Sequence, residues 1–403
     1  MTKRLSMIWL LAVAACGAPS RTSPPAAAVS AEDTALGQRV DAAITAVVAA
    51  QRTVGVVVLI ARDGNVIYQR ATGHADREAK TPVTVDTIFR LASMTKPIVS
   101  VVALALVDQG ALRLDDPVTK WLPEFRPKLV DGRDAVITVR HLITHTSGLG
   151  YRFMQAPEGS YHQAEVSDGL AEPGLAFAEN ARRLASVPLL FEPGTQWHYG
   201  LSIDVLGEVV ARAGGGTLDQ VVQRTISEPL GLRDLAFTVT ASDRLAAPYG
   251  STTPPTRMTE PYAETAYGMT IPFAPSRILD PASYHSGGAG AASTAHDYLR
   301  FVEAIRTGGA PILAAETARA MTQNQIGTLA PIQGPGWNFG YGVGVVADPA
   351  AAKSTQGVGS WSWAGVYGTY FWVDPAARLS VIVMTNVVGL TLPVAIEQAV
   401  YAR

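Results

Sequence analysis

The sequence predicts an α+β fold in which one sheet takes strands from both ends of the chain and a mainly helical segment is inserted between them. Two strand-like runs at 54–61 and 66–68, separated by the turn residues Asp63-Gly64, indicate a β-hairpin near the beginning. Apolar residues at helical spacing dominate the middle of the chain. Strand-like runs return near the end, at 342–346, 367–373 and 379–384.

Helices are predicted wherever apolar residues recur every three or four positions. The first such segment precedes the hairpin, and a short capped helix is expected within 137–149. That first segment is 31–51, and the others with this spacing are 98–107, 175–185, 201–213, 217–226, 294–306 and 392–401. Two stretches, 151–173 and 247–285, lack periodicity and are rich in turn residues or tyrosine, so we expect long loops there.

The composition is that of an ordinary globular protein, with 403 residues, 48% of them apolar and 16% charged. The formal net charge is -2 and no basic stripe is visible, which argues against a nucleic-acid partner. The single cysteine, Cys16, excludes an intramolecular disulfide. The sequence gives no indication of the oligomeric state.

The first residues have the pattern of an export signal. Lys3 and Arg4 precede a short apolar run that is too short to span a bilayer. Val-Ala-Ala-Cys at 13–16 resembles a bacterial lipobox, in which Cys16 becomes the lipidated first residue. Gly17 resembles a signal for sorting to the outer membrane, so we expect a periplasmic protein of the bacterial envelope whose contact with membrane is the lipid anchor alone. The alternative is an ordinary signal peptide cleaved nearby, with Cys16 lost.

Ser93 and Lys96 form the strongest chemical signal. They lie where a strand-like segment ending at Phe89 meets the apolar helical run 98–107. Residues three apart share a helix face, so the lysine amine would lie one turn above the serine hydroxyl. A serine nucleophile needs an adjacent base, and burial can lower the pKa of a lysine enough for it to serve. The tetrad alone also fits a solvated helix start.

Six motifs give the sequence a wider resemblance. In order they are Leu-Ala-Ser-Met-Thr-Lys-Pro at 91–97, Leu-Asp-Asp-Pro-Val at 114–118, Leu-Ile-Thr-His-Thr-Ser-Gly-Leu at 142–149, Phe-Glu-Pro-Gly at 191–194, Ser-Gly-Gly-Ala-Gly at 286–290 and Trp-Ala-Gly-Val at 363–366. In this order the chain resembles the serine β-lactamase and penicillin-binding protein superfamily. It looks most like the class C β-lactamase branch and, within it, the family VIII carboxylesterases. The resemblance covers most of the chain after about residue 54.

The resemblance implies a serine β-lactamase-like α+β fold, with an antiparallel sheet flanked by helices, an all-helical domain, and the active site in the cleft between them. The expected units are a lipoprotein signal peptide, a flexible tether, a sheet domain in two pieces and a mainly helical domain. Their boundaries are 1–16, 17–35, 36–100 with 287–403, and 101–286.

The resemblance also assigns site residues. Ser93 is implied as nucleophile with Lys96 as its partner, and Tyr199 stands where the family has the tyrosine of Tyr-x-Asn. Tyr199 is therefore expected to share the proton with Lys96 and pass it to the leaving alcohol. The Asn of that motif is replaced by Leu201, which we expect beside the substrate. Without the resemblance, Tyr199 would be read as a core aromatic residue.

The third family motif is Lys-Thr-Gly or similar, on an edge strand that lines the cleft. Trp363-Ala364-Gly365 matches it here, with Trp363 offering apolar contact and Gly365 allowing substrate close to the strand. The amide groups of Ser93 and Val366 are implied as the oxyanion hole. A register on 357–359 is an open alternative, because Trp361 lies close by.

Other chemistries find little support. His141 and His145 are four residues apart, but no further ligand pattern accompanies them, so we expect no metal site. No Gly-x-Ser-x-Gly occurs, which argues against the α/β-hydrolase triad. We expect a serine carboxylesterase that needs no cofactor and hydrolyses short to medium neutral esters. The alternatives are a β-lactamase, a D-amino-acid peptidase or an acyltransferase of the same fold, and a non-catalytic penicillin-binding envelope lipoprotein.

Overall fold

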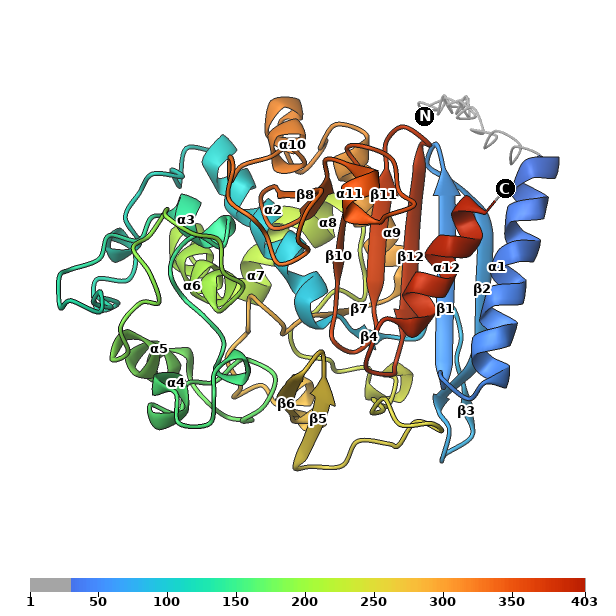
Figure 1. Cartoon of the computed structure of the whole chain (residues 1–403), viewed down its shortest axis with the longest axis horizontal. Helices are drawn as coiled ribbons and strands as arrows, with labels where there is room; N and C mark the ends of the chain where they lie inside the picture. Colours follow the sequence, from blue (N-terminus) through green and yellow to red (C-terminus); the bar gives the residue numbers. More distant parts are fainter. Residues whose placement is uncertain (1–29, 403) are drawn as a thin grey trace, which may run out of the picture.

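A computed structural model describes residues 30–402. One eight-stranded antiparallel sheet runs through the molecule, and strands from the two ends of the chain meet at its centre, where β1 lies between β2 and β12 (Figure 1). In spatial order the strands are β3 (Thr81–Pro82), β2 (Asn65–Asp76), β1 (Gly55–Arg62), β12 (Leu379–Thr385), β11 (Tyr370–Asp374), β10 (Trp361–Ala364), β9 (Gly344–Val346) and β8 (Trp337–Phe339). The predicted sheet built from both ends is confirmed.

Both faces of the sheet are covered, because its central strands are apolar on each side. Val56, Val58 and Ile60 of β1 pack with α1 (Ala31–Ala49) and α12 (Thr391–Tyr401). The alternate residues of β1 belong to the main core on the opposite face, where α9 (Ala295–Arg306) packs on β12 and β1. Strands buried on both faces read as continuous apolar runs, as the first hairpin strand does.

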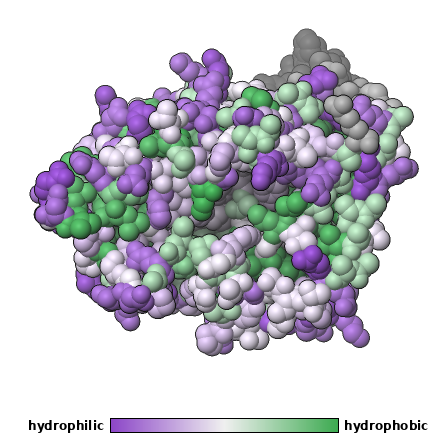
Figure 2. Space-filling model, viewed as in Figure 1, coloured by the Kyte–Doolittle hydropathy of each residue, from purple (hydrophilic) through white to green (hydrophobic). Residues whose placement is uncertain are grey.

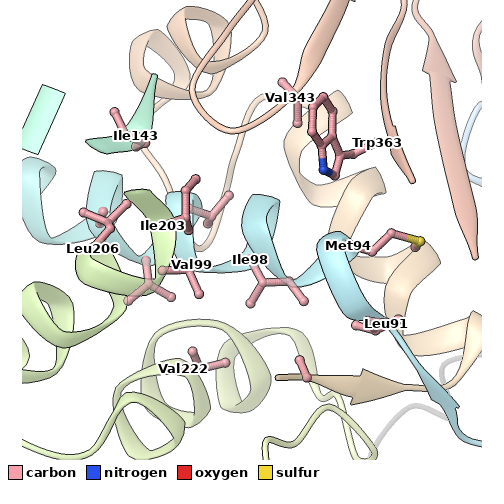
Figure 3. Close-up of a cluster of buried hydrophobic side chains, with 14 of the residues drawn as sticks. Leu91, Met94, Ile98, Val99, Ile143, Ile203, Leu206, Val222, Val343 and Trp363 are labelled. Carbon is pink, nitrogen blue, oxygen red and sulfur yellow. The ribbon is translucent and has the colours of Figure 1, made fainter. Parts of the chain in front are cut away.

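The helical part of the chain packs around α2 (Thr95–Asp108), whose residues 95–106 are all buried. A helix that is apolar all round is expected to be surrounded by protein. Figure 3 shows Ile98 and Val99 of α2 facing Ile203 of α6 (Ser202–Gly214) and Val222 of α7 (Leu218–Val222). The remaining helices are α3 (Val139–Ile143), α4 (Ser160–Gln163), α5 (Phe177–Ala185), α8 (Glu228–Leu230), α10 (Ala315–Met321) and α11 (Pro349–Ala352).

The structure corrects three expectations. Helix α1 begins at Ala31 with Ser30 as its N-cap, so residues 31–35 belong to the helix predicted over 31–51 and not to the tether. The expected loop 247–285 contains the hairpin β5 (Tyr262–Ala266) and β6 (Met269–Phe273). Its turn is Tyr267-Gly268, with positive φ at both residues, as a tight hairpin requires. The expected loop 151–173 contains α4.

No helix among residues 30–402 is both long and apolar enough to cross a membrane. The expected signal peptide, the lipobox with Cys16 and the first part of the tether lie outside the described residues.

Candidate active site

Ser93 lies at the entry to α2 and is held there by the main chain on either side. The two-residue strand β4 (Phe89–Arg90) pairs with β7 (Ala292–Ser293), and the N–H of Leu91 donates to the carbonyl of Ala291 at 2.9 Å. Ala92 then adopts a left-handed φ of 44°, which is sterically unfavourable for a residue with a side chain. Ser93 follows within a single 3-10 turn that leads directly into α2. The strand-to-helix junction predicted for Ser93 is confirmed.

Three of the predicted residues meet at one oxygen atom. Lys96 Nζ donates to Ser93 Oγ at 3.0 Å, and the hydroxyl of Tyr199 donates to the same Oγ at 2.7 Å. Lys96 also donates to the carbonyl of Gly288 at 2.8 Å, and its side chain is completely buried. A serine oxygen that accepts from both an amine and a phenol has two groups in reach for its proton, the arrangement an activated nucleophile requires.

A buried carboxylate, Asp204, lies behind this group and was missed at the sequence level. Ser286 Oγ donates to Asp204 Oδ1 at 2.5 Å. Burial raises the pKa of Asp204, whereas the Ser286 hydrogen bond and the positive charge of Lys96 oppose that rise. A Cβ added to Gly288 would lie 2.2 Å from Asp204 Oδ2, so the carboxylate packs directly against the residue whose carbonyl holds Lys96. An aspartate in the first turn of an apolar helix was the available signal.

Aromatic rings enclose Tyr199. His145 and Trp363 lie with ring centroids 5.0 Å and 5.6 Å from it, and Tyr151 meets it edge-on at 5.2 Å. Burial, reinforced by the charge of Lys96, lowers the pKa of His145 well below its usual range, so the imidazole is neutral. Burial likewise raises the pKa of Tyr151 well above its usual range. These neutral rings fix the phenol of Tyr199 by packing.

A cavity of about 590 Å³ opens beside Ser93 and Tyr199, and the space-filling view shows a hollow with apolar patches around it (Figure 2). Its walls come from the 151–154 turn, the β5–β6 hairpin, the 332–337 segment, the end of β10 and helix α12. Most of these residues are apolar: Tyr151, Phe153, Met154, Leu170, Tyr267, Met269, Ile271, Ile332, Trp337, Trp363, Val366, Leu390, Pro393 and Val394. Such a cavity accepts an apolar ligand and places it against Ser93.

The end of β10 supplies part of this wall. Trp363, Gly365 and Val366 all line the cavity, as predicted. The N–H of Val366 donates no hydrogen bond to any group within residues 30–402, so this amide is available to an oxygen beside Ser93. Donors positioned in this way stabilise the negative oxygen of a tetrahedral intermediate.

A family profile described as Beta-lactamase matches residues 40–400. The chain belongs to the beta-lactamase family. This assignment covers both the sheet and the inserted helical segment, and it confirms the expected fold.

Individual relatives refine the assignment. The chain is 46% identical to Esterase EstB of Burkholderia gladioli, over 93% of this chain and 98% of that protein. Its structure resembles that of EstCE1, described as a hydrolase with promiscuous acyltransferase activity, with a TM-score of 0.89 and 42% identity over 93% of this chain and 100% of that chain. Acyltransferase calJ of Penicillium decumbens is 30% identical over 79% of this chain and 80% of that protein. The resemblance to family VIII carboxylesterases is confirmed.

One substrate-side expectation, that Leu201 lies beside the substrate, is wrong. Leu201 is completely buried in the main core and, within the described residues, is not part of the cavity wall. The reason is that it immediately precedes α6, so its side chain packs inward. Gly365 lines the cavity as expected, and its lack of a side chain also makes room for the carbonyl of Leu91, which lies 2.1 Å from the position that a Cβ would occupy.

Strand β10 is an inner strand, but β9 pairs only with Trp361 and Ser362, so the edge beyond them is open. The alternative register on 357–359 fails, since Val358 is 64% exposed and none of the three lines the cavity in the described part of the chain. No group of three His, Cys, Asp or Glu side chains that could hold a metal is found among residues 30–402.

Proposed function

We propose that the protein is a serine carboxylesterase that hydrolyses short to medium neutral esters through an acyl-enzyme on Ser93. The observation that carries the proposal is the position of Ser93 Oγ, which accepts from Lys96 and Tyr199 at the wall of an apolar cavity. The name of the relative Esterase EstB supports the same reaction.

The geometry supports the following mechanism. Lys96 and Tyr199 take up the proton of Ser93 as Oγ attacks the ester carbonyl. The N–H groups of Ser93 and Val366 hold the negative oxygen of the tetrahedral intermediate. Tyr199 passes the proton to the leaving alcohol, and the acyl group remains on Ser93. Water then attacks the acyl-enzyme with the same groups acting in reverse, and the carboxylic acid leaves.

Trp363 lies at the family position of a cationic residue, which accounts for the proposed preference for neutral substrates. A β-lactam carboxylate would lose a charge-assisted contact there, and such contacts contribute roughly 1.5–3 kcal/mol. An apolar acyl or alcohol group loses nothing and can pack on the indole ring.

The decisive experiment compares kcat/KM for p-nitrophenyl esters of several chain lengths, for nitrocefin and for a D-Ala-D-Ala peptide, using the purified protein. We expect clear hydrolysis of short to medium esters, slow turnover of nitrocefin and none of the peptide. A kcat/KM for nitrocefin that equals the best ester would identify a β-lactamase. No turnover of any compound, together with no labelling of Ser93 by a fluorophosphonate, would favour a binding protein.

Acyl transfer is a second candidate, favoured by the size and apolar lining of the cavity, which can hold an alcohol beside the acyl-enzyme. The descriptions of EstCE1 and of Acyltransferase calJ point the same way. Adding an apolar primary alcohol to the p-nitrophenyl ester reaction would test this. If acyl transfer to the alcohol occurs, a new ester must form and the yield of free acid must fall.

We also propose that Cys16 carries a lipid that anchors the protein to the periplasmic side of the bacterial outer membrane. The support is the lipobox-like sequence at 13–16 and the following Gly17. In a bacterial host the wild type should partition with membranes and incorporate labelled palmitate, and Cys16→Ser should not. A soluble wild type with a mature N-terminus beyond Cys16 would disprove the anchor.

A further inference from the structure

A second, much smaller cavity lies next to the catalytic cavity. Its accessible volume is about 20 Å³, and it shares Leu170 and Ala289 with the larger space. Two arginines and a tyrosine contribute the polar groups of its wall. The lining residues are Arg90, Gly169, Leu170, Ala274, Arg277, Ile278, Ala289, Gly290 and Tyr367.

Among residues 30–402, neither guanidinium group has a carboxylate partner; Arg277 is buried and Arg90 is half-buried. Arg90 donates to the carbonyls of Ala246 and Pro275, each at 2.7 Å, and Arg277 donates to the carbonyl of Tyr284 at 2.7 Å. Arg277 is 7% exposed, and its buried Nε has no hydrogen-bond partner. Within residues 30–402, no carboxylate lies within 4.0 Å of either guanidinium.

More distant carboxylates compensate these charges only in part. Glu260 acts on Arg90 from a distance, but its oxygens accept from the main chain and hydroxyl of Ser276. The positive charge of Arg277 acts to lower the pKa of Asp204, but the Asp204 carboxylate already accepts a hydrogen bond from Ser286. Arg277 also lies over the Tyr284 ring, 4.6 Å from its centroid. Carbonyl and ring partners leave a buried cation with a desolvation cost that an anion beside it would offset.

Tyr367 adds a neutral donor to the same cavity. Burial raises its pKa to about 12, although both arginines lower it, so the phenol keeps its proton near neutral pH. A hydroxyl and two guanidinium groups are the donors that a small anion requires. The accessible volume admits about one water-sized particle and excludes a sulfate or a carboxylic acid.

We propose that this cavity binds a single small halide, of the size of chloride or bromide, between Arg90 and Arg277. The ion would offset one of the two positive charges and fix the 286–290 loop, since Ala289 and Gly290 line the cavity. That loop also carries the Gly288 carbonyl that accepts from Lys96. The site therefore lies directly behind the catalytic group without touching its reacting atoms.

Crystals of the wild-type protein soaked in sodium bromide test the site directly. An anomalous bromine peak between the two guanidinium groups is expected, and its absence in a well-ordered cavity would overturn the proposal. In solution, the protein is first exchanged into sodium gluconate. Chloride, bromide and sulfate are then added at matched ionic strength while the melting temperature is followed. Halides should raise it along a saturating curve, because they bind the folded state alone. Sulfate should not.

Arg277→Met should abolish the saturating response. Arg319→Met, which removes an exposed arginine of α10, should keep it and serves as the matched control. If Arg277→Met does not fold, Arg277→Lys can replace it, because it retains a cation without the guanidinium. The halide concentration needed for half-saturation should then be higher by about tenfold or more. An equal response of the wild type to chloride and sulfate would indicate general salt screening and would contradict a specific site.

Discussion

The two sides of the catalytic cavity are built in different ways. On the side of α2 and α6, Ser93, Lys96 and Tyr199 are joined by hydrogen bonds of 2.7–3.0 Å and supported by buried polar groups. On the opposite side, β10, α12 and the β5–β6 hairpin contribute mainly apolar side chains from segments far apart in the chain. The first side fixes the chemistry through few, exact contacts. The second side selects the ligand through shape and apolar area, so its residues can change without loss of the reaction.

Removing the reacting groups gives the largest expected effect. Ser93→Ala and Lys96→Met should each lower the kcat of ester hydrolysis by about 10³-fold or more, because the nucleophile and its base act as one unit. The double variant should be little worse than either single one. Steady-state kinetics with a p-nitrophenyl ester measure the loss. Ser100→Ala changes a buried serine on the same helix and is the matched control. Retention of most of kcat in Lys96→Met would contradict this account of the catalytic side.

Asp204→Asn tests whether the polar support behind Lys96 matters. The amide oxygen can still accept from Ser286, so the variant removes the carboxylate charge, and the difference between a charged and a neutral partner corresponds to roughly 1.5–3 kcal/mol at most, or about 10–100-fold in kcat. The carboxylate reaches the reaction only through Gly288 and Lys96, so we expect kcat to fall with KM unchanged and the pH dependence of kcat to shift. Asp204→Glu should not restore it, since Gly288 leaves no space for a longer side chain. An unchanged pH profile would reduce Asp204 to a structural role.

Trp363→Ala tests the apolar side. The indole is 7% exposed and packs against Tyr199 and Phe339 at 5.6 Å and 5.4 Å. We expect kcat/KM for medium-chain esters to fall by about tenfold through lost apolar contact, with a smaller effect on an acetate ester. Circular dichroism must first show an intact fold. Equal losses for all chain lengths would mean that Trp363 positions Tyr199 and does not bind the substrate.

The catalytic side was largely predictable from the sequence, because its key relation is local. Ser93 and Lys96 meet since they are three residues apart at a helix start. Tyr199 could be named only through the family motif, because nothing in its neighbourhood sets its direction. Leu201 illustrates this limit: two residues further along the chain, the side chain already points into the core.

The apolar side and the support behind it were poorly predicted. The β5–β6 hairpin was missed because Pro272 and its polar residues disguise the strand pattern. Asp204 was missed because it sits within an otherwise regular apolar helix, and its partner Ser286 is far away in the chain. Contacts of this kind depend on how distant segments meet, which single-sequence patterns do not contain.

The smallest expected effect is a change in how stability depends on pH, and it concerns Asp168 on the cavity wall. Burial raises the pKa of Asp168 to about 7, although the N–H groups of Arg152 and Phe153 donate to it at 2.7 and 3.1 Å and oppose that rise. In the unfolded chain an aspartate titrates near about 4. Between these values the folded state holds the extra proton, so this contribution to stability is present below about pH 4 and lost as the pH rises towards 7. Asp168→Asn removes it and keeps one acceptor oxygen, so one of the two N–H groups loses its partner at every pH, which shifts the curve without changing its slope. The urea midpoint of the wild type, relative to the variant, should therefore fall between pH 5 and 7 and level off above, with a slope of at most about 1.4 kcal/mol per pH unit. Parallel curves for the two proteins would show that Asp168 on the cavity wall does not titrate. The polar content of the two sides of the cavity would then differ less than the structure indicates.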